Sequence, residues 1–142
     1  MVNCSSALRV IVGVAMLAAC SGCGTGRPAT VAVTGTVTYQ GRPVEGADVR
    51  FMGKSGPIAT GTTDAQGRFT LRTFAAGDGA VPGEYTVLIS KTEKVIDPRN
   101  PDNPYPLSRN LLPERYGNPV ASGLTATVKS GEKNDFTFPL TD

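Results

Sequence analysis

The chain has 142 residues, a length that suits one domain. Lys and Arg number 14 against 12 Asp and Glu, and the net charge of +2 is spread without a basic run, so nucleic-acid binding is not indicated. Histidine is absent, which excludes Ser-His-Asp and Cys-His catalysis and histidine-containing zinc sites. Carboxylate chemistry and oxygen-ligand metal sites remain open.

Residues 1–19 are typical of a signal peptide. Arg9 and the amino terminus supply positive charge, and residues 10–19 form an apolar run. This run is too short for a membrane-spanning helix, which needs about 20 residues, but it suits the apolar region of a signal peptide. A buried core helix is disfavoured because the run lies at the extreme N-terminus, before a Gly-rich stretch.

The apolar run ends in a motif, Leu17-Ala18-Ala19-Cys20, that resembles the lipobox of bacterial lipoproteins. The resemblance implies cleavage before Cys20 and acyl chains on its sulfur and its amine. Two or three acyl chains give stable membrane anchoring, because each buried methylene contributes roughly 0.8 kcal/mol. Ser21 is not the aspartate that commonly retains lipoproteins at the inner membrane. We therefore expect an extracytoplasmic, lipid-anchored protein of the cell membrane or, in a cell with two membranes, the outer membrane.

The remaining cysteines predict no disulfide within the domain. Cys4 would leave with the signal peptide, and Cys23 would remain in the tether as an unpaired thiol. Cys20 and Cys23 also match a CxxC pattern of redox or metal sites, but no second pair follows and the lipobox claims Cys20. An ordinary secreted protein or an uncleaved anchor would also fit an apolar N-terminal run. Residues 20–30 are predicted to be a lipidated, flexible tether with a reach of about 15–20 Å.

Residues 31–142 are predicted to form one all-β domain. Apolar and polar side chains alternate in short runs that are bounded by turn residues. Seven strands are expected, at residues 31–39, 47–51, 58–63, 69–73, 85–89, 124–128 and 136–140. Pro139 cannot donate to a sheet ladder, so the last strand should be an edge or should end there. Asp64 is expected to cap its own turn, the alternative being a calcium ligand.

The segment 92–123 is predicted to be a long loop, because six prolines interrupt it. Pro113 could begin one helical turn. Leu111, Leu112 and Tyr116 are expected to pack this loop onto the domain. The alternative is a ligand surface made by Tyr105, Arg109, Arg115 and Tyr116, with Arg99 nearby, although plain solvation of the arginines is favoured.

Two motifs carry a resemblance to a known family. Residues 41–51 (GRPVEGADVRF) followed by 63–69 (TDAQGRF) resemble the carboxypeptidase regulatory-like domain, and residues 81–87 (VPGEYTV) match its next strand. Residues 112–116 and 122–124 look like small bacterial envelope lipoproteins that carry this domain alone. The resemblance implies a seven-stranded, antiparallel, transthyretin-like Greek-key β-sandwich.

The fold that this resemblance implies also occurs in enzymes. Hydroxyisourate hydrolases of transthyretin type need histidines, intradiol dioxygenases need two histidines and two tyrosines on iron, and metallocarboxypeptidases carry catalysis in a separate domain. This chain lacks those features, so we expect no enzymatic activity, no cofactor and no metal site.

The leading hypothesis is therefore a non-enzymatic, lipid-anchored envelope module. Its partners would be the membrane, through the anchor, and an envelope protein or glycan. Competing hypotheses are a glycan-binding module or a calcium-dependent adhesion module that uses the segment 92–123, and least of all a carboxylate-pair hydrolase. The calcium hypothesis rests on four carboxylates: Asp64, Asp78, Asp97 and Asp102.

Overall fold

The computed structural model describes residues 26–142, so the predicted signal peptide, Cys20 and Cys23 lie outside the described residues. As expected, the described chain is all-β. It contains ten strands, where seven were predicted, and one short 3₁₀ helix. No helix in this part of the chain is long and apolar enough to cross a membrane. The elements are β1 (Val33–Tyr39), β2 (Arg42–Pro43), β3 (Asp48–Gly53), β4 (Ala59–Thr62), β5 (Arg68–Thr70), β6 (Gly83–Ser90), β7 (Thr92–Val95), β8 (Leu107–Asn110), η1 (Glu114–Gly117), β9 (Thr125–Val128) and β10 (Asn134–Leu140).

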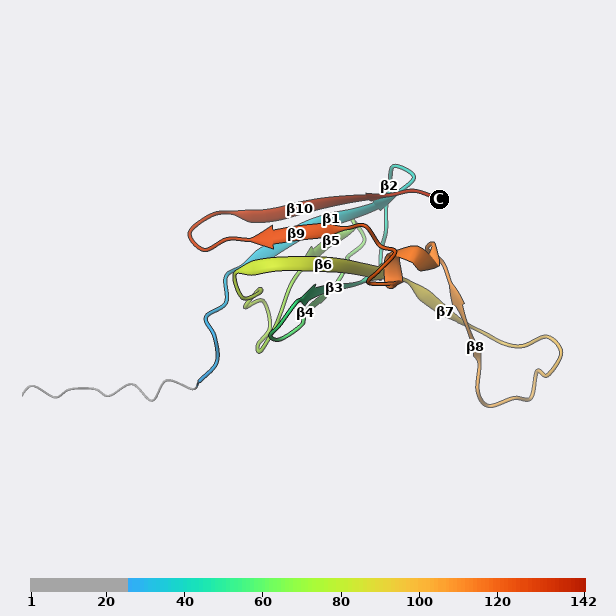
Figure 1. The fold of residues 1–142 in the computed structure, drawn as a ribbon. Helices are drawn as coiled ribbons and strands as arrows, with labels where there is room; N and C mark the ends of the chain where they lie inside the picture. Colours follow the sequence, from blue (N-terminus) through green and yellow to red (C-terminus); the bar gives the residue numbers. More distant parts are fainter. Residues whose placement is uncertain (1–25) are drawn as a thin grey trace, which may run out of the picture.

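The strands form two four-stranded sheets and a separate two-stranded one (Figure 1). The first sheet has the order β10-β1-β2, with β5 also paired to β1, and the second has the order β4-β3-β6-β9. All but one of the strand pairs are antiparallel. β1 and β10 pair in parallel over seven residues, from Val33 opposite Asn134 to Tyr39 opposite Leu140. The expectation of a purely antiparallel domain is therefore wrong at this edge, and Pro139 lies in an edge strand as predicted.

The two larger sheets are joined along one side by the chain that leaves β5. Thr60 and Arg72 exchange two backbone hydrogen bonds, each with an N···O distance of 2.8 Å. One residue earlier, the N–H of Leu71 donates to the carbonyl of Val33 in the first sheet, at 2.9 Å. Residues 68–72 therefore pair with both sheets and cover the outer edge of β4, an edge that would otherwise be open to another chain.

The predicted alternation places the expected side chains in the core. Ala47, Val49 and Phe51 are fully buried, as are Leu71 and Val87. The Phe51 ring lies at the centre of this core, since β3 directs it from the second sheet toward the first. It contacts one ring of its own sheet and three of the other, with centroids 5.7–6.3 Å apart, namely Tyr85, Phe69, Phe136 and Phe138.

Gly35 makes room for an aromatic ring within the first sheet. It lies in the middle of β1 with the same parity as Val33 and Val37, so a side chain there would point into the core. An added Cβ would lie 2.5 Å from the Phe69 ring and 2.5 Å from the carbonyl oxygen of Phe136. The absence of a side chain at Gly35 therefore makes room for an aromatic ring from the neighbouring strand.

The proline-rich segment is more regular than its composition predicted. β7 and β8 form a hairpin, and η1 follows at its base (Figure 1). The strands form because the prolines at 98, 101, 104 and 106 all lie in the loop between them, where no ladder hydrogen bond is lost. The expected helical turn after Pro113 is present as η1.

Truncating the central ring should test the core. We expect Phe51→Ala to lower the free energy of unfolding by about 3–5 kcal/mol, because it removes a fully buried ring and leaves a cavity between the sheets. Phe74→Ala is the matched control, since Phe74 is 39% exposed and should change stability little. Urea unfolding monitored by circular dichroism measures both values, and equal losses would contradict the assigned centre of the core.

Candidate functional site

The four residues predicted as a ligand surface lie in two separate places. Tyr105 lies in the hairpin loop and is 78% exposed, and Arg109 on β8 forms an ion pair with Glu93 on β7. Arg115 and Tyr116 belong to η1 at the base of the hairpin. Within residues 26–142, no hydrogen bond or ion pair joins Tyr105 or Arg109 to the η1 pair, so the four do not form one polar site.

Arg115 and Tyr116 hold the C-terminal end of the chain. The Arg115 guanidinium lies 4.8 Å from the centroid of the Tyr116 ring and donates to the Tyr116 hydroxyl at 2.9 Å and to the Thr141 carbonyl at 2.6 Å. The Tyr116 hydroxyl accepts from the N–H of Thr141 and donates to its carbonyl, both at 3.0 Å. Burial raises the pKa of Tyr116, but the hydrogen bonds from Thr141 and Arg115 outweigh it and leave the pKa below its usual value.

The packing interpretation of this segment is confirmed for two of its three residues. Leu112 and Tyr116 are each 6% exposed and belong to the core cluster, whereas Leu111 is 36% exposed. Beside them, the Asp142 carboxylate accepts hydrogen bonds from the Tyr39 hydroxyl and the Gln40 amide. The hydrogen bond to Asp142 raises the pKa of Tyr39. The polar groups of Arg115 and Tyr116 therefore bond to each other and to Thr141 of the same chain.

Three of the four carboxylates considered for calcium, those of Asp64, Asp78 and Asp97, accept hydrogen bonds from nearby backbone N–H groups. Asp64 accepts hydrogen bonds from the N–H groups of Gln66 and Arg68, each at 2.9 Å, which confirms its predicted role in the turn. Asp78 accepts three backbone N–H groups, and Asp97 pairs with Arg99. In the part of the chain that the structure describes, no three acidic or cysteine side chains converge as a metal site would require.

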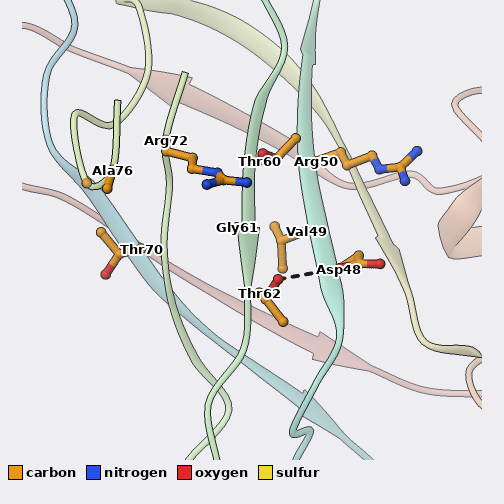
Figure 2. Close-up of a pocket in the computed structure, with 10 residues that line it drawn as sticks. Asp48, Val49, Arg50, Thr60, Gly61, Thr62, Thr70, Arg72 and Ala76 are labelled. Carbon is orange, nitrogen blue, oxygen red and sulfur yellow. Dashed lines mark hydrogen bonds between the residues drawn. The ribbon is translucent and has the colours of Figure 1, made fainter. Parts of the chain in front are cut away.

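A charged cleft on the second sheet was missed at the sequence level. It has a volume of about 450 Å³ and lies along β3, β4 and the chain that follows β5. Arg50, Thr60 and Arg72 are direct neighbours across these three segments, as Figure 2 shows, and both arginine side chains extend along the sheet in the same direction. Neither guanidinium forms an ion pair within residues 26–142. The alternation of apolar and polar residues predicts that both arginines lie on the outer face of the sheet. It does not predict which strands lie next to each other, so it could not reveal this cleft.

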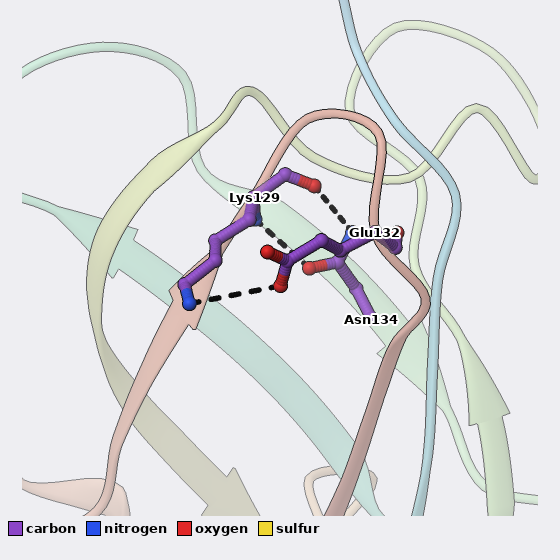
Figure 3. Close-up of polar contacts among 3 residues, drawn as sticks. All are labelled: Lys129, Glu132 and Asn134. Atoms are coloured by element: carbon purple, nitrogen blue, oxygen red, sulfur yellow. Dashed lines mark hydrogen bonds and ion pairs between the residues drawn. The ribbon is translucent and has the colours of Figure 1, made fainter.

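The turn between β9 and β10 is fixed by a buried amide (Figure 3). The Asn134 side chain is nearly inaccessible, accepts from the N–H of Lys129 at 2.9 Å and donates to the carbonyls of Lys129 and Glu132 at 2.9 and 3.1 Å. The Lys129 ammonium also lies 3.6 Å from the Glu132 carboxylate. These contacts fix the conformation of the turn. The three residues bond to one another within it.

Comparison with known proteins assigns neither a family nor a function to this chain. No protein-family model matches the chain, and no curated protein matches it. Among solved structures, the chain is similar to the crystal structure of a 9R-lipoxygenase from Cyanothece PCC8801, with 15% sequence identity and a TM-score of 0.38. The similarity covers 80% of this chain but only 16% of the lipoxygenase chain. A TM-score this low supports neither a shared fold nor a shared activity.

Removing the Tyr116 hydroxyl should weaken the attachment of the C-terminal residues. We expect Tyr116→Phe to lower the free energy of unfolding by about 1–2 kcal/mol, because the N–H of Thr141 loses its acceptor. Tyr105→Phe is the control, since the exposed Tyr105 hydroxyl should contribute nothing measurable. Denaturant titration of the two variants compares them, and indistinguishable midpoints would show that the hydroxyl is dispensable.

The Asp78 carboxylate should make stability depend on pH. The N–H group of Thr73 at 2.6 Å, with those of Phe74 and Ala75, holds its pKa below the usual value against the effect of desolvation. The stabilisation is then fully present above the unfolded pKa of about 3.9 and is lost as the pH falls through the lower, folded pKa.

We therefore expect Asp78→Asn to lower the melting temperature at pH 7 and to lower it less as the pH falls below about 4. Asp102→Asn, in the exposed hairpin loop, is the matched control. Melting curves between pH 2 and pH 7 provide the measurement. A deficit that stays constant over this range would exclude the carboxylate as its cause.

Proposed function

We propose that this chain is a non-enzymatic lipoprotein of a bacterial cell envelope, anchored through Cys20 and exposed outside the cytoplasm. The observation that carries the proposal is the Leu17-Ala18-Ala19-Cys20 motif at the end of an apolar run. Cys20, the last residue of this motif, is 13 positions before Val33, where β1 begins. The domain would therefore be held close to the membrane and would serve as a structural or binding module there.

The finer fold that we propose is a transthyretin-like, Greek-key β-sandwich of the carboxypeptidase regulatory-like kind. Two four-stranded sheets in contact through Phe51 are compatible with it. Further support comes from Tyr85 near the start of β6, whose hydroxyl donates to the carbonyl of Val81 at 2.7 Å. A tyrosine that bonds to the backbone a few residues upstream is a recurring feature of Greek-key sandwiches.

The shape of the domain supports a display role. In Figure 1 the first described residues and the β7–β8 hairpin lie at opposite ends of the two sheets. An anchor at Cys20 would then direct the hairpin away from the bilayer. The hairpin loop exposes Ile96 at 69% and Tyr105 at 78%, and an envelope protein or a glycan would meet these side chains first.

The anchor can be tested by mass and by partition. We expect the native chain, purified from membranes, to begin at Cys20 and to carry two or three acyl chains, and to enter the detergent-rich phase of a Triton X-114 separation. Cys20→Ala should lose the acyl mass and leave that phase, because a protein without acyl chains has no buried methylenes. Cys23→Ala is the control and should behave as the native chain does. An unmodified Cys20 sulfur in native material would refute the proposal.

A further inference from the structure

Loops that are far apart in the sequence meet where the N-terminal segment leaves the domain. Val31 and Ala80 exchange backbone hydrogen bonds with N···O distances of 2.9 and 3.0 Å. The Arg27 guanidinium lies 5.5 Å from the centroid of the Phe74 ring. The β9–β10 turn reaches the same end, since Gly83 at the start of β6 pairs with Val128 at the end of β9. The described chain therefore enters the domain beside these loops.

An exposed apolar pair occupies this end. Ile58 comes directly before β4, and Phe74 comes two residues after Arg72, which bridges to Thr60 on β4, so both residues lie at this end of the second sheet. Their side chains are 46% and 39% exposed. The other four phenylalanines of the chain form the aromatic cluster of the core, so Phe74 alone projects outward.

The arginines of the charged cleft lie just behind this pair. Arg72 is two residues from Phe74 and Thr60 is two residues from Ile58, so at most about 7 Å of chain separates the arginine row from the apolar pair. Arg50 continues the same row on β3. The planar guanidinium group suits phosphate because it can donate two parallel hydrogen bonds.

The spacing of these two layers fits a phospholipid surface. The headgroup region on each side of a bilayer is about 5–7 Å thick, half the difference between the full thickness and the hydrocarbon core. If Ile58 and Phe74 reach the acyl boundary, Arg72 lies at the depth of the phosphates. Five residues separate Cys20 from Gly26, and the six steps between them span at most about 20 Å, so an acylated Cys20 would keep this end within that distance of the membrane.

We propose that this end of the domain is a docking surface for phospholipids, with Ile58 and Phe74 at the acyl boundary and with Arg50 and Arg72 on the headgroup phosphates. The proposal deepens the proposed function and rests on its lipid anchor. The anchor would supply affinity, and the docking surface would fix the orientation, so that the hairpin points outward.

The absence of tryptophan makes a direct test possible. Phe74→Trp places a single fluorophore on the docking surface, and Tyr105→Trp places one at the opposite end as the matched control. Each acylated protein is reconstituted into vesicles of phosphatidylethanolamine and phosphatidylglycerol whose acyl chains are brominated. We expect blue-shifted and strongly quenched emission from the Phe74→Trp protein and unquenched emission from the Tyr105→Trp protein. Equal quenching of the two proteins, or no quenching of the first, would overturn the proposal.

A second arm tests the arginines. In the Phe74→Trp background, Arg50→Gln with Arg72→Gln should reduce quenching several-fold, whereas Arg42→Gln with Arg68→Gln, on the other sheet, should not. Excess inorganic phosphate should leave quenching unchanged, because acyl contact accompanies headgroup binding. Equal effects of the two arginine pairs, or loss of quenching on addition of free phosphate, would count against the docking surface.

Vesicle flotation separates this proposal from the proposed function. Phe74→Trp protein that floats with the vesicles while its tryptophan stays unquenched would keep the anchor and remove the docking surface. Protein that does not float would remove the anchor and, with it, the docking surface. Melting curves of every variant check that the domain remains folded.

Discussion

The contact of Phe51 with aromatic rings on both sheets is the interaction on which the rest of the domain depends. Phe51 comes from β3 in the second sheet, and three of its four ring partners come from β5 and β10 in the first. Aromatic side chains bury the largest apolar areas of any residues, and tilted pairs such as these add specific ring contacts. Gly35 leaves β1 without a side chain where the Phe69 ring of the same sheet lies. The missing Cβ on β1 therefore gives Phe69 the space from which it contacts Phe51.

This core gives the molecule two unlike ends. At one end, side chains of the turns themselves fix the backbone, as Asp78 and Asn134 do through their hydrogen bonds to it. At the other end, the long segment after β6 is held at its base by Leu112, Tyr116 and the contact with Thr141, while its hairpin stays outside the core. A rigid body with short, fixed loops at one end and a long projection at the other suits a protein held at a surface from one side.

The sequence was informative wherever a structure follows from neighbouring residues, and it was silent where distant segments meet. Alternation along β3 correctly assigned Val49 and Phe51 to the interior, and the Asp64 turn followed from its own residues. The parallel pairing of β1 with β10 was missed, because periodicity identifies the face of a strand and not its partner. The same reason hid the Arg50–Thr60–Arg72 row. Arg115 and Tyr116 had the composition of a ligand surface, and only the position of Thr141 reveals that they bind their own chain.

The pairing of the first long strand with the last also bears on how the protein is made. β1 takes its main partner from residues 134–140, about one hundred positions later, and contacts this distant in sequence form slowly because a long loop must close first. A chain that emerges from a ribosome or a translocation pore from its N-terminus cannot complete the first sheet until its final residues are free. For the export that we propose, such late closure would keep the chain unfolded while it passes through the translocation pore.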